Sequence, residues 1–321
     1  MKQHYVTRGY LTLFTDPATP AEQEPFLWVF ERDGEAPFRR APHKVAVKAD
    51  YYTATIDGQR EDVIEEALSK IESKALPVIR DLARGRQPAE LDAEERRDLA
   101  AFLGFMETRV PKFRGSVERT VAEVMKMVSL TAAEHPEYFE RTMREAMRAK
   151  GKEPPTDIEA VRQFVLSGEY DVIGNPLISL QMMLAQAPRI AQYAYDFQWR
   201  VLDAPDGEIF ITSDAPFVHV ATERPPAAWM GVGWFSPYME ATFPLSPSAC
   251  LLISQHRPSG RERVAPDRVH EVNRRTAAHA EREAYSSRPL ASGQLNRPDG
   301  WEWWTPLTAE ILPQFAEQTS D

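Results

Sequence analysis

The sequence predicts an α+β protein. Apolar residues follow a helical spacing through the middle of the chain, they alternate with a period of two on both sides of it, and no repeat of fixed length occurs. The 321 residues are 43% hydrophobic, which is enough for a sizeable core. We expect a central helical bundle packed with a C-terminal antiparallel sheet and a small N-terminal β hairpin.

Residues 1–60 predict an N-terminal helix and a hairpin, because residues 26–48 alternate like two short strands about Asp33 and Gly34. Residues 61–198 predict the bundle. Its first helix carries an apolar stripe from Ile64 to Leu82. Its second begins at Asp92, a predicted N-cap with Glu95 three residues later, and further helices run to Phe197.

Residues 199–321 predict the antiparallel sheet, a last helix and an aromatic tail. We expect one strand pair in residues 199–214, another in 241–255, a helix over 266–285 and the tail at 300–307. The terminal β pieces are each too small to hold a core alone. The sequence therefore predicts one domain over residues 1–321.

Composition limits the class of partner. The net charge is -10 with a pI near 5.4, which argues against a broad nucleic-acid or anionic membrane surface. No apolar run is long enough to span a membrane, and the chain begins without an apolar signal core, so we expect a cytoplasmic protein. The single cysteine, Cys250, lies in an apolar run typical of a buried strand.

The first candidate site residues are His4 and Arg8. Four residues apart, they share one face of a helix or a strand, which places a proton-transfer group beside a fixed cation. Glu65 and Glu72 lie along one edge of the apolar stripe in the first long helix.

Arg109 extends the buried face of the second helix, and Arg114 follows about one turn later. A buried guanidinium needs a carboxylate or a bound anion beside it. Two interpretations stay open: Arg109 forms an internal ion pair with one of the glutamates, or it clamps an anionic ligand.

Asp214 ends a hydrophobic strand, next to Ser213 and before Pro216. A carboxylate in this place suits a metal site or the orientation of a base, and it equally suits an ordinary Asx turn. Asn273 lies on the inner face of the last helix, where a core amide needs partners of its own.

Six motifs occur in order along the chain: HYVTRGYL, LWVFERDG, EALSKIE, ETRVPKFR, FITSDAPF and FPLSP. With them the chain resembles a bacterial family of unknown function numbered four-two-three-eight, whose hallmark is a His-Tyr-Val-Pro start. The resemblance implies no activity. It places the family's motif residues on His4, Tyr5, Arg8, Glu72, Arg109, Pro111, Ser213, Asp214, Pro216, Pro244 and Pro247.

Three positions depart from the family pattern. Thr7 replaces a proline, which still suits a helix start, and Val110 lies within the family's Arg-Thr-Pro. Ala215 lies within its Ser-Asp-Asn-Pro and removes an amide beside Asp214. Any role that the family gives to that amide is therefore lost here.

The sequence lacks the common nucleotide-binding loops, the paired zinc-ligand motifs and the G-x-S-x-G nucleophile elbow. The remaining enzyme hypothesis is a metal-assisted hydrolase of phosphate esters, of which a nuclease-like effector of bacterial defence is one form. In it Glu65, Glu72 or Asp214 holds Mg2+ or Mn2+, His4 moves a proton, and Arg8 or Arg109 neutralises phosphate.

We expect Arg109, Arg114, Ser213 and Asn273 to be the binding residues of such a site. The alternative is a non-catalytic ligand-sensing or protein-interaction module, in which the same residues form a structural network. In either case the expected partner is an anionic small molecule or a nucleic acid, not a membrane. The oligomeric state stays open.

Overall fold

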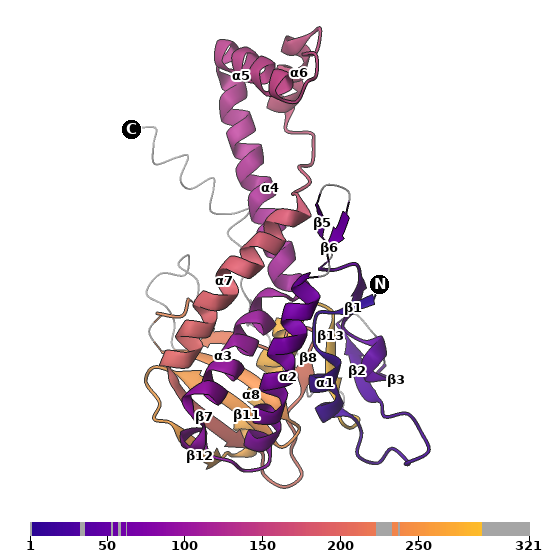
Figure 1. Cartoon of the computed structure of the whole chain (residues 1–321), viewed down its shortest axis with the longest axis vertical. Coiled ribbons are helices and arrows are strands. Elements are labelled where there is room, and N and C mark those ends of the chain that lie inside the picture. Colours follow the sequence, from indigo (N-terminus) through magenta and orange to yellow (C-terminus); the bar gives the residue numbers. More distant parts are fainter. Residues whose placement is uncertain are drawn as a thin grey trace. The chain divides into compact units, whose positions relative to one another are not determined.

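The computed structural model of the chain describes residues 2–32, 36–52, 54–56, 59–61, 63–222, 233–236 and 238–290, and these fold as an α+β protein (Figure 1). The chain divides into two compact units. Of the described residues, unit 1 contains those in 2–114 and 180–290, and unit 2 contains 115–179. The expectation of one domain over residues 1–321 stays a prediction. The aromatic tail lies outside the described residues.

Helices α2 to α7 occupy the middle of the chain, as expected, while α1 lies near the N-terminus and α8 lies between β12 (Gly260–Arg263) and β13 (Glu283–Ser286). They are α1 (Arg8–Leu11), α2 (Val63–Ala83), α3 (Ala93–Thr108), α4 (Pro111–Glu134), α5 (Pro136–Ala149), α6 (Ile158–Ser167), α7 (Pro176–Asp196) and α8 (Pro266–His279), with 3-10 turns η1 (Thr12–Phe14), η2 (Pro42–Lys44) and η3 (Pro88–Glu90).

The larger sheet of unit 1 is the predicted C-terminal sheet. Its order is β12-β7-β11-β10-β9, and its pairs are antiparallel except for the parallel pair β12 and β7. The strands are β7 (Gln198–Asp203), β9 (Val218–Ala221), β10 (Met239–Ser246), β11 (Ala249–Ser254) and β12 (Gly260–Arg263).

The second sheet has the order β3-β2-β13-β8, in which β2 and β3 form the expected N-terminal hairpin. Two further strand pairs, β1 with β4 and β5 with β6, complete the N-terminal β structure. The strands are β1 (Lys2–His4), β2 (Leu27–Glu31), β3 (Phe38–Arg40), β4 (Val47–Ala49), β5 (Ala54–Ile56), β6 (Gln59–Glu61), β8 (Thr212–Ser213) and β13 (Glu283–Ser286).

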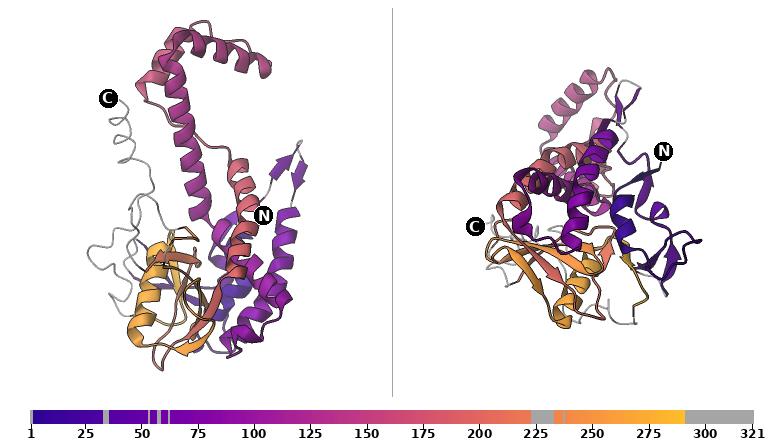
Figure 2. Two further views of the ribbon diagram at one scale, coloured as in Figure 1. Left: turned by 90° about the vertical axis from the view of Figure 1, so that its left-hand side faces the viewer. Right: turned by 60° about the horizontal axis from the view of Figure 1, so that its bottom comes forward.

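Helices cover both faces of the larger sheet (Figure 2). On one face Phe243 and Leu251 pack in one apolar cluster with Phe102 of α3. On the other, Cys250 packs with Val272 of α8. Cys250 is fully buried, as its apolar setting predicts, and burial raises its pKa to about 12.

The N-terminal segment belongs to the same core. The Tyr10 hydroxyl of α1 lies 2.7 Å from Thr212 Oγ1 and donates to the Pro244 carbonyl at 2.8 Å. Tyr10 and Phe14 have no exposed surface. The segment therefore connects to both sheets of unit 1.

Two local features hold α3 in place. Its predicted N-cap is confirmed, because the Asp92 side chain accepts from the N–H of Glu94 and of Glu95. Near its other end Gly104 contacts the backbone of α7 so closely that a Cβ there would overlap the Ala187 carbonyl oxygen. The last turn of α3, which carries Glu107 and leads to the C-cap Arg109, is thereby fixed.

Two sequence expectations are wrong. Residues 199–214 do not form a strand pair, because both edges of β7 are occupied, by β11 and β12, while β8 pairs with β13. The last helix ends at His279 rather than at Tyr285. The side chain of Asp214 binds the next backbone N–H groups, and β13 then joins the second sheet.

Candidate functional site

His4 lies at the end of β1, opposite Val47 of β4. Burial lowers its pKa below 6.5, opposed by a hydrogen bond to the Pro42 carbonyl and by the charge of Glu72. Its Nε2 is buried and has no hydrogen-bond partner among the described residues. The donor to Pro42 is therefore Nδ1, and Nε2 is left as a neutral acceptor.

Arg109, the C-cap of α3, is 1% exposed and binds Glu72 of α2. Its Nη1 donates to Glu72 Oε1 at 2.7 Å, and the Thr7 hydroxyl donates to Glu72 Oε2 at 2.7 Å. The ion pair required by the first interpretation of Arg109 is thus present. Arg109 Nε is buried without a partner in the described part of the chain.

These residues form one group with the N-terminus. The charges of Glu72, Arg109 and Arg8 all act on the pKa of His4, so these three predicted residues lie within electrostatic range of it. Arg8 is exposed at the start of α1. We call His4, Thr7, Glu72 and Arg109 the His4 site.

Arg114 contacts Tyr51 directly, and Glu65 is connected to Tyr52 through Gln3. Arg114 donates to the Tyr51 carbonyl at 2.6 Å, and its guanidinium lies 4.4 Å from the centre of the Tyr51 ring. Glu65 accepts from Gln3 Nε2 at 2.6 Å, while Gln3 Oε1 accepts from the Tyr52 N–H. Both predicted residues therefore hold the chain before β5.

Asp214 closes the connection between α8 and β13. Its carboxylate accepts from the backbone N–H groups of Glu281, Arg282 and Glu283 at 2.8, 2.7 and 3.1 Å. Burial raises its pKa to about 6, against the effect of these three bonds. Next to it, Ser213 Oγ accepts from the Ala215 N–H at 3.2 Å.

The predicted metal ligands do not form one group. Glu65 and Glu72 bind side chains of the N-terminus, whereas Asp214 binds the backbone that follows α8. Within the described ranges, no cluster of three His, Cys, Asp or Glu residues is arranged to hold a metal ion.

Asn273 of α8 braces the segment between β7 and β8. Its Nδ2 donates to the Ile209 carbonyl at 2.7 Å, and its Oδ1 accepts from the Ile211 N–H at 3.0 Å. Both partners are backbone groups on one segment. This core amide therefore has the partners that it needs.

Sequence reasoning missed a second polar cluster, at β9, an edge strand of the larger sheet. Glu107 of α3 places Oε1 3.4 Å from His219 Nδ1 on β9. Burial raises the pKa of Glu107 to about 8 and lowers that of His219 to about 4. At neutral pH Glu107 is therefore largely protonated and His219 is neutral.

Lys112 and His279 lie next to this pair. Lys112 Nζ donates to the His279 carbonyl at 2.7 Å and lies 3.2 Å from its Nδ1. Burial lowers the pKa of Lys112 to about 8, and the Arg32 charge adds to this effect. Burial and the Lys112 charge lower the pKa of His279, on which His219 also acts.

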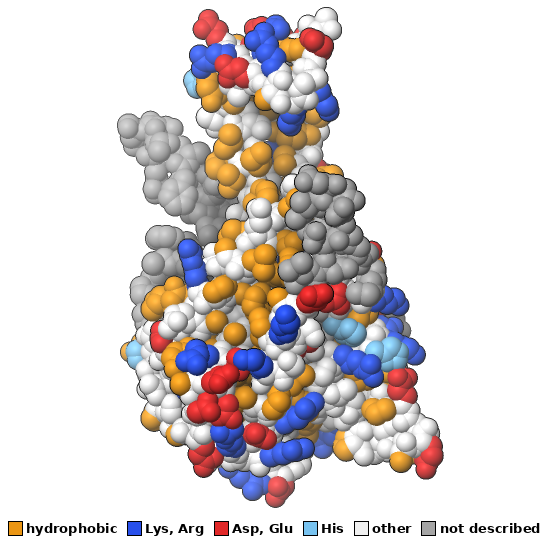
Figure 3. Space-filling view, viewed as in Figure 1, with side chains coloured by type: hydrophobic (Ala, Val, Ile, Leu, Met, Phe, Trp, Pro, Cys, Tyr) orange, Lys and Arg blue, Asp and Glu red, His pale blue; other side chains and the backbone are white. Residues whose placement is uncertain are grey.

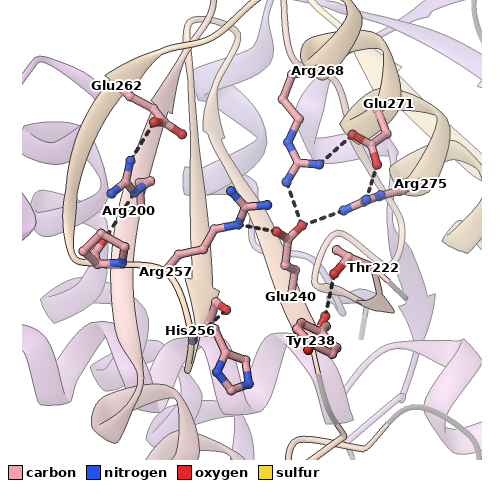
Figure 4. Close-up of polar contacts among 12 residues, drawn as sticks. Arg200, Thr222, Tyr238, Glu240, His256, Arg257, Glu262, Arg268, Glu271 and Arg275 are labelled. Atoms are coloured by element: carbon pink, nitrogen blue, oxygen red, sulfur yellow. Dashed lines mark hydrogen bonds and ion pairs between the residues drawn. The ribbon is translucent and has the colours of Figure 1, made fainter. Parts of the chain in front are cut away.

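A third cluster, also missed, surrounds Glu240 of β10, which is 2% exposed and faces three arginines (Figure 4). Glu240 Oε1 lies 2.6 Å from Arg257 Nε, and Oε2 lies 2.6 Å from Arg268 Nη2 and 3.2 Å from Arg275 Nη1. Burial acts to raise the pKa of Glu240, but the arginines outweigh it and hold the pKa below 4.5. Glu271 binds Arg268 and Arg275 in turn.

The molecular surface shows no broad basic face on the side seen in Figure 3, where blue and red side chains are interspersed. On α5, Arg144 pairs with Glu140 and Arg141 lies over the ring of Tyr138. Among the helices that the structure describes, none combines the length and the apolar character needed to cross a membrane.

Comparison with known proteins gives a family. The family model described as Protein of unknown function (DUF4238) matches residues 2–289. No curated protein and no solved structure matches the chain.

Proposed function

The chain belongs to the family of proteins of unknown function DUF4238, and we propose from its geometry that it binds a small phosphoryl ligand at the His4 site. The observation that carries the proposal is a pair of buried nitrogens without partners in the described structure, His4 Nε2 and Arg109 Nε. The first is an acceptor and the second a donor. A phosphate group that carries both an O–H and a charged oxygen satisfies both.

Charge supports an anionic ligand. Arg8 and Arg109 carry two positive charges close to His4, and Glu72 carries one negative charge. An additional anion therefore enters a region of net positive charge. Since Glu72 already binds Arg109 through Nη1, the ligand binds at Nε without breaking the ion pair.

A metal-assisted phosphodiesterase or nuclease is the second candidate, favoured by the neutral, unpartnered Nε2 of His4, which suits a general base. Glu65, Glu72 and Asp214 each accept hydrogen bonds from other groups of the protein, and they share none of these partners. This donor set does not fit one Mg2+ or Mn2+ ion, so we assign no step to a metal.

Thermal unfolding with inorganic phosphate, sulfate or chloride tests the binding proposal. At neutral pH sulfate has no O–H to donate to His4, so phosphate should raise the melting temperature and sulfate should not. His4→Phe removes the acceptor and should abolish the phosphate response. The exposed His135 at the start of α5 provides the control, His135→Gln.

Equal responses to phosphate and sulfate, or a phosphate response that survives His4→Phe, would refute the binding proposal. The hydrolase candidate is tested on the same proteins with p-nitrophenyl phosphate and its diester, with Mg2+, Mn2+ or chelator. The hydrolase candidate requires that the wild-type protein hydrolyses one of these substrates and that His4→Phe does not. Phosphate binding without turnover would exclude the hydrolase and support the ligand-sensing function.

A further inference from the structure

The Glu107 cluster contains polar atoms that the fold leaves unsatisfied. Glu107 Oε2, His219 Nε2 and Trp234 Nε1 are all buried, and none has a hydrogen-bond partner among the residues described. The Trp234 indole is close enough to lower the pKa of Glu107, but its N–H does not reach hydrogen-bond geometry. Leaving three such groups unpaired is costly, and a ligand that bonds to them would remove this cost.

The cluster is partly exposed to solvent. The side chains of Glu107 and His219 are 22% and 16% exposed, although the two unpartnered atoms are buried. Trp234 is 8% exposed, whereas the adjacent Phe235 is 67% exposed. The exposed Phe235 ring contacts Tyr193 and Phe197, so this aromatic group extends from the buried Trp234 to the protein surface.

Aromatic rings surround these polar atoms. The His219 ring centre lies 4.7 Å from that of Trp234 and 5.0 Å from that of Phe217. Tyr193 and Phe197 lie 6.0 and 5.6 Å from Trp234. Such surroundings favour a flat ligand with a π face.

The charge of the Glu107–His219 pair limits the charge of the ligand that can bind there. With Glu107 protonated and His219 neutral, the pair carries no net charge near neutral pH. The neighbouring Lys112 is bound to the His279 carbonyl. An ionic ligand would be desolvated here without a counter-charge, so a neutral ligand is favoured.

We propose that Glu107, His219 and Trp234 form a second binding site, for a neutral planar heterocycle that presents a hydrogen-bond donor and an acceptor along one edge, as a nucleobase does. Glu107 and Trp234 supply donors, and His219 supplies an acceptor or a donor according to its tautomer. The site is separate from the His4 site and does not depend on phosphate binding there.

Isothermal titration calorimetry with free adenine tests the proposal. Benzoate is the anionic aromatic control, and urea is the control that has hydrogen-bonding groups without a ring. We expect adenine to bind and both controls to bind at least about tenfold more weakly, a difference of about 1.4 kcal/mol. Failure of adenine to bind, or equal binding of benzoate, overturns the proposal.

Two variants of Glu107 sharpen the test. Glu107→Gln keeps a neutral donor and acceptor and should retain adenine binding, whereas Glu107→Leu should lose at least tenfold in affinity. Leucine replaces a buried carboxyl by an apolar group of similar size, so this variant should remain folded, which its thermal melt checks. Adenine binding that is unchanged in Glu107→Leu contradicts the assignment.

A third variant and a control separate the two sites. Trp234→Phe keeps a ring and removes the N–H, and we expect a several-fold loss of adenine affinity. His4→Phe should leave adenine binding unchanged even where it abolishes the phosphate response. Loss of adenine binding in His4→Phe would contradict a separate second site.

Discussion

Arg109 Nη1 donates to Glu72 Oε1 at 2.7 Å, so the end of α3 is connected to α2 through a guanidinium that is 1% exposed. Arg109→Ala leaves the Glu72 carboxylate without this partner, and we expect a loss of about 3–5 kcal/mol in the free energy of unfolding. Urea denaturation measures it. The double variant Arg109→Met with Glu72→Leu should recover much of the loss, and a double variant no more stable than Arg109→Ala would contradict this role.

Glu107 should make stability fall as pH rises. Its pKa is about 8 in the folded protein against about 4.5 unfolded, so the folded state binds the proton more tightly, and the free energy of unfolding decreases between these two values. Glu107→Gln cannot ionise. Urea denaturation at about pH 5 and about pH 8 should show a decline of a few kcal/mol that is smaller in the variant. Parallel pH profiles for the two proteins would exclude the shift.

Asp214 should protect the backbone that follows α8 from hydrogen exchange. Asp214→Ala leaves three N–H groups, of residues 281–283, without their acceptor, and we expect a cost of about 1–3 kcal/mol. Exchange should accelerate at these amides. Asp214→Asn keeps one acceptor oxygen and should show an intermediate effect, and unchanged exchange in the alanine variant would argue against the capping role.

Glu240 should be among the carboxylates that the fold needs most. Glu240→Gln removes the charge that three arginines share, and we expect a loss of about 3–5 kcal/mol in the free energy of unfolding. The matched control is Glu262→Gln, which breaks an ion pair of a 40% exposed carboxylate with Arg200 and should cost about 0–1 kcal/mol. Similar losses in the two variants would show that the buried Glu240 cluster stabilises the fold no more than an exposed ion pair does.

Removal of residues 1–60 should prevent the rest of unit 1 from folding. The deletion takes Tyr10, Leu11 and Phe14 out of the main core, where all three are fully buried. Each such loss costs about 2–5 kcal/mol, against a total stability of about 5–15 kcal/mol. A calorimetric scan tests this, and a cooperative transition at the wild-type temperature would show that the N-terminal segment is dispensable.

Periodicity predicted the parts of the site that lie on regular elements. Arg109 continues the buried face of α3, and Glu72 lies at the edge of the stripe on α2, so their meeting could be expected. The role of Asp214 could not be assigned, because an Asx turn and a metal site have the same local sequence. Its partners lie sixty-seven to sixty-nine residues away, where only the fold places them.

The missed clusters arise from pairing between distant elements. Glu107 follows Leu103 by four residues, which is a signal that it faces inward, but nothing local pairs it with His219. On α8 the spacing of Arg268, Glu271 and Arg275 does place three charges on one helix face. That face would normally be assigned to solvent, and only the register of β10 brings Glu240 against it.

The close contact at Gly104 limits which sequences this fold tolerates. A side chain at this position, even a methyl group, would overlap the backbone of α7 at Ala187, so α3 and α7 would have to move apart. Glu107 belongs to the proposed second binding site and Arg109 to the His4 site. Both lie within the five residues that follow Gly104, so both would shift with the helix. Gly104 has no functional group, yet replacing it should impair every activity that depends on either site. In a mutational scan it should therefore behave like a functional residue.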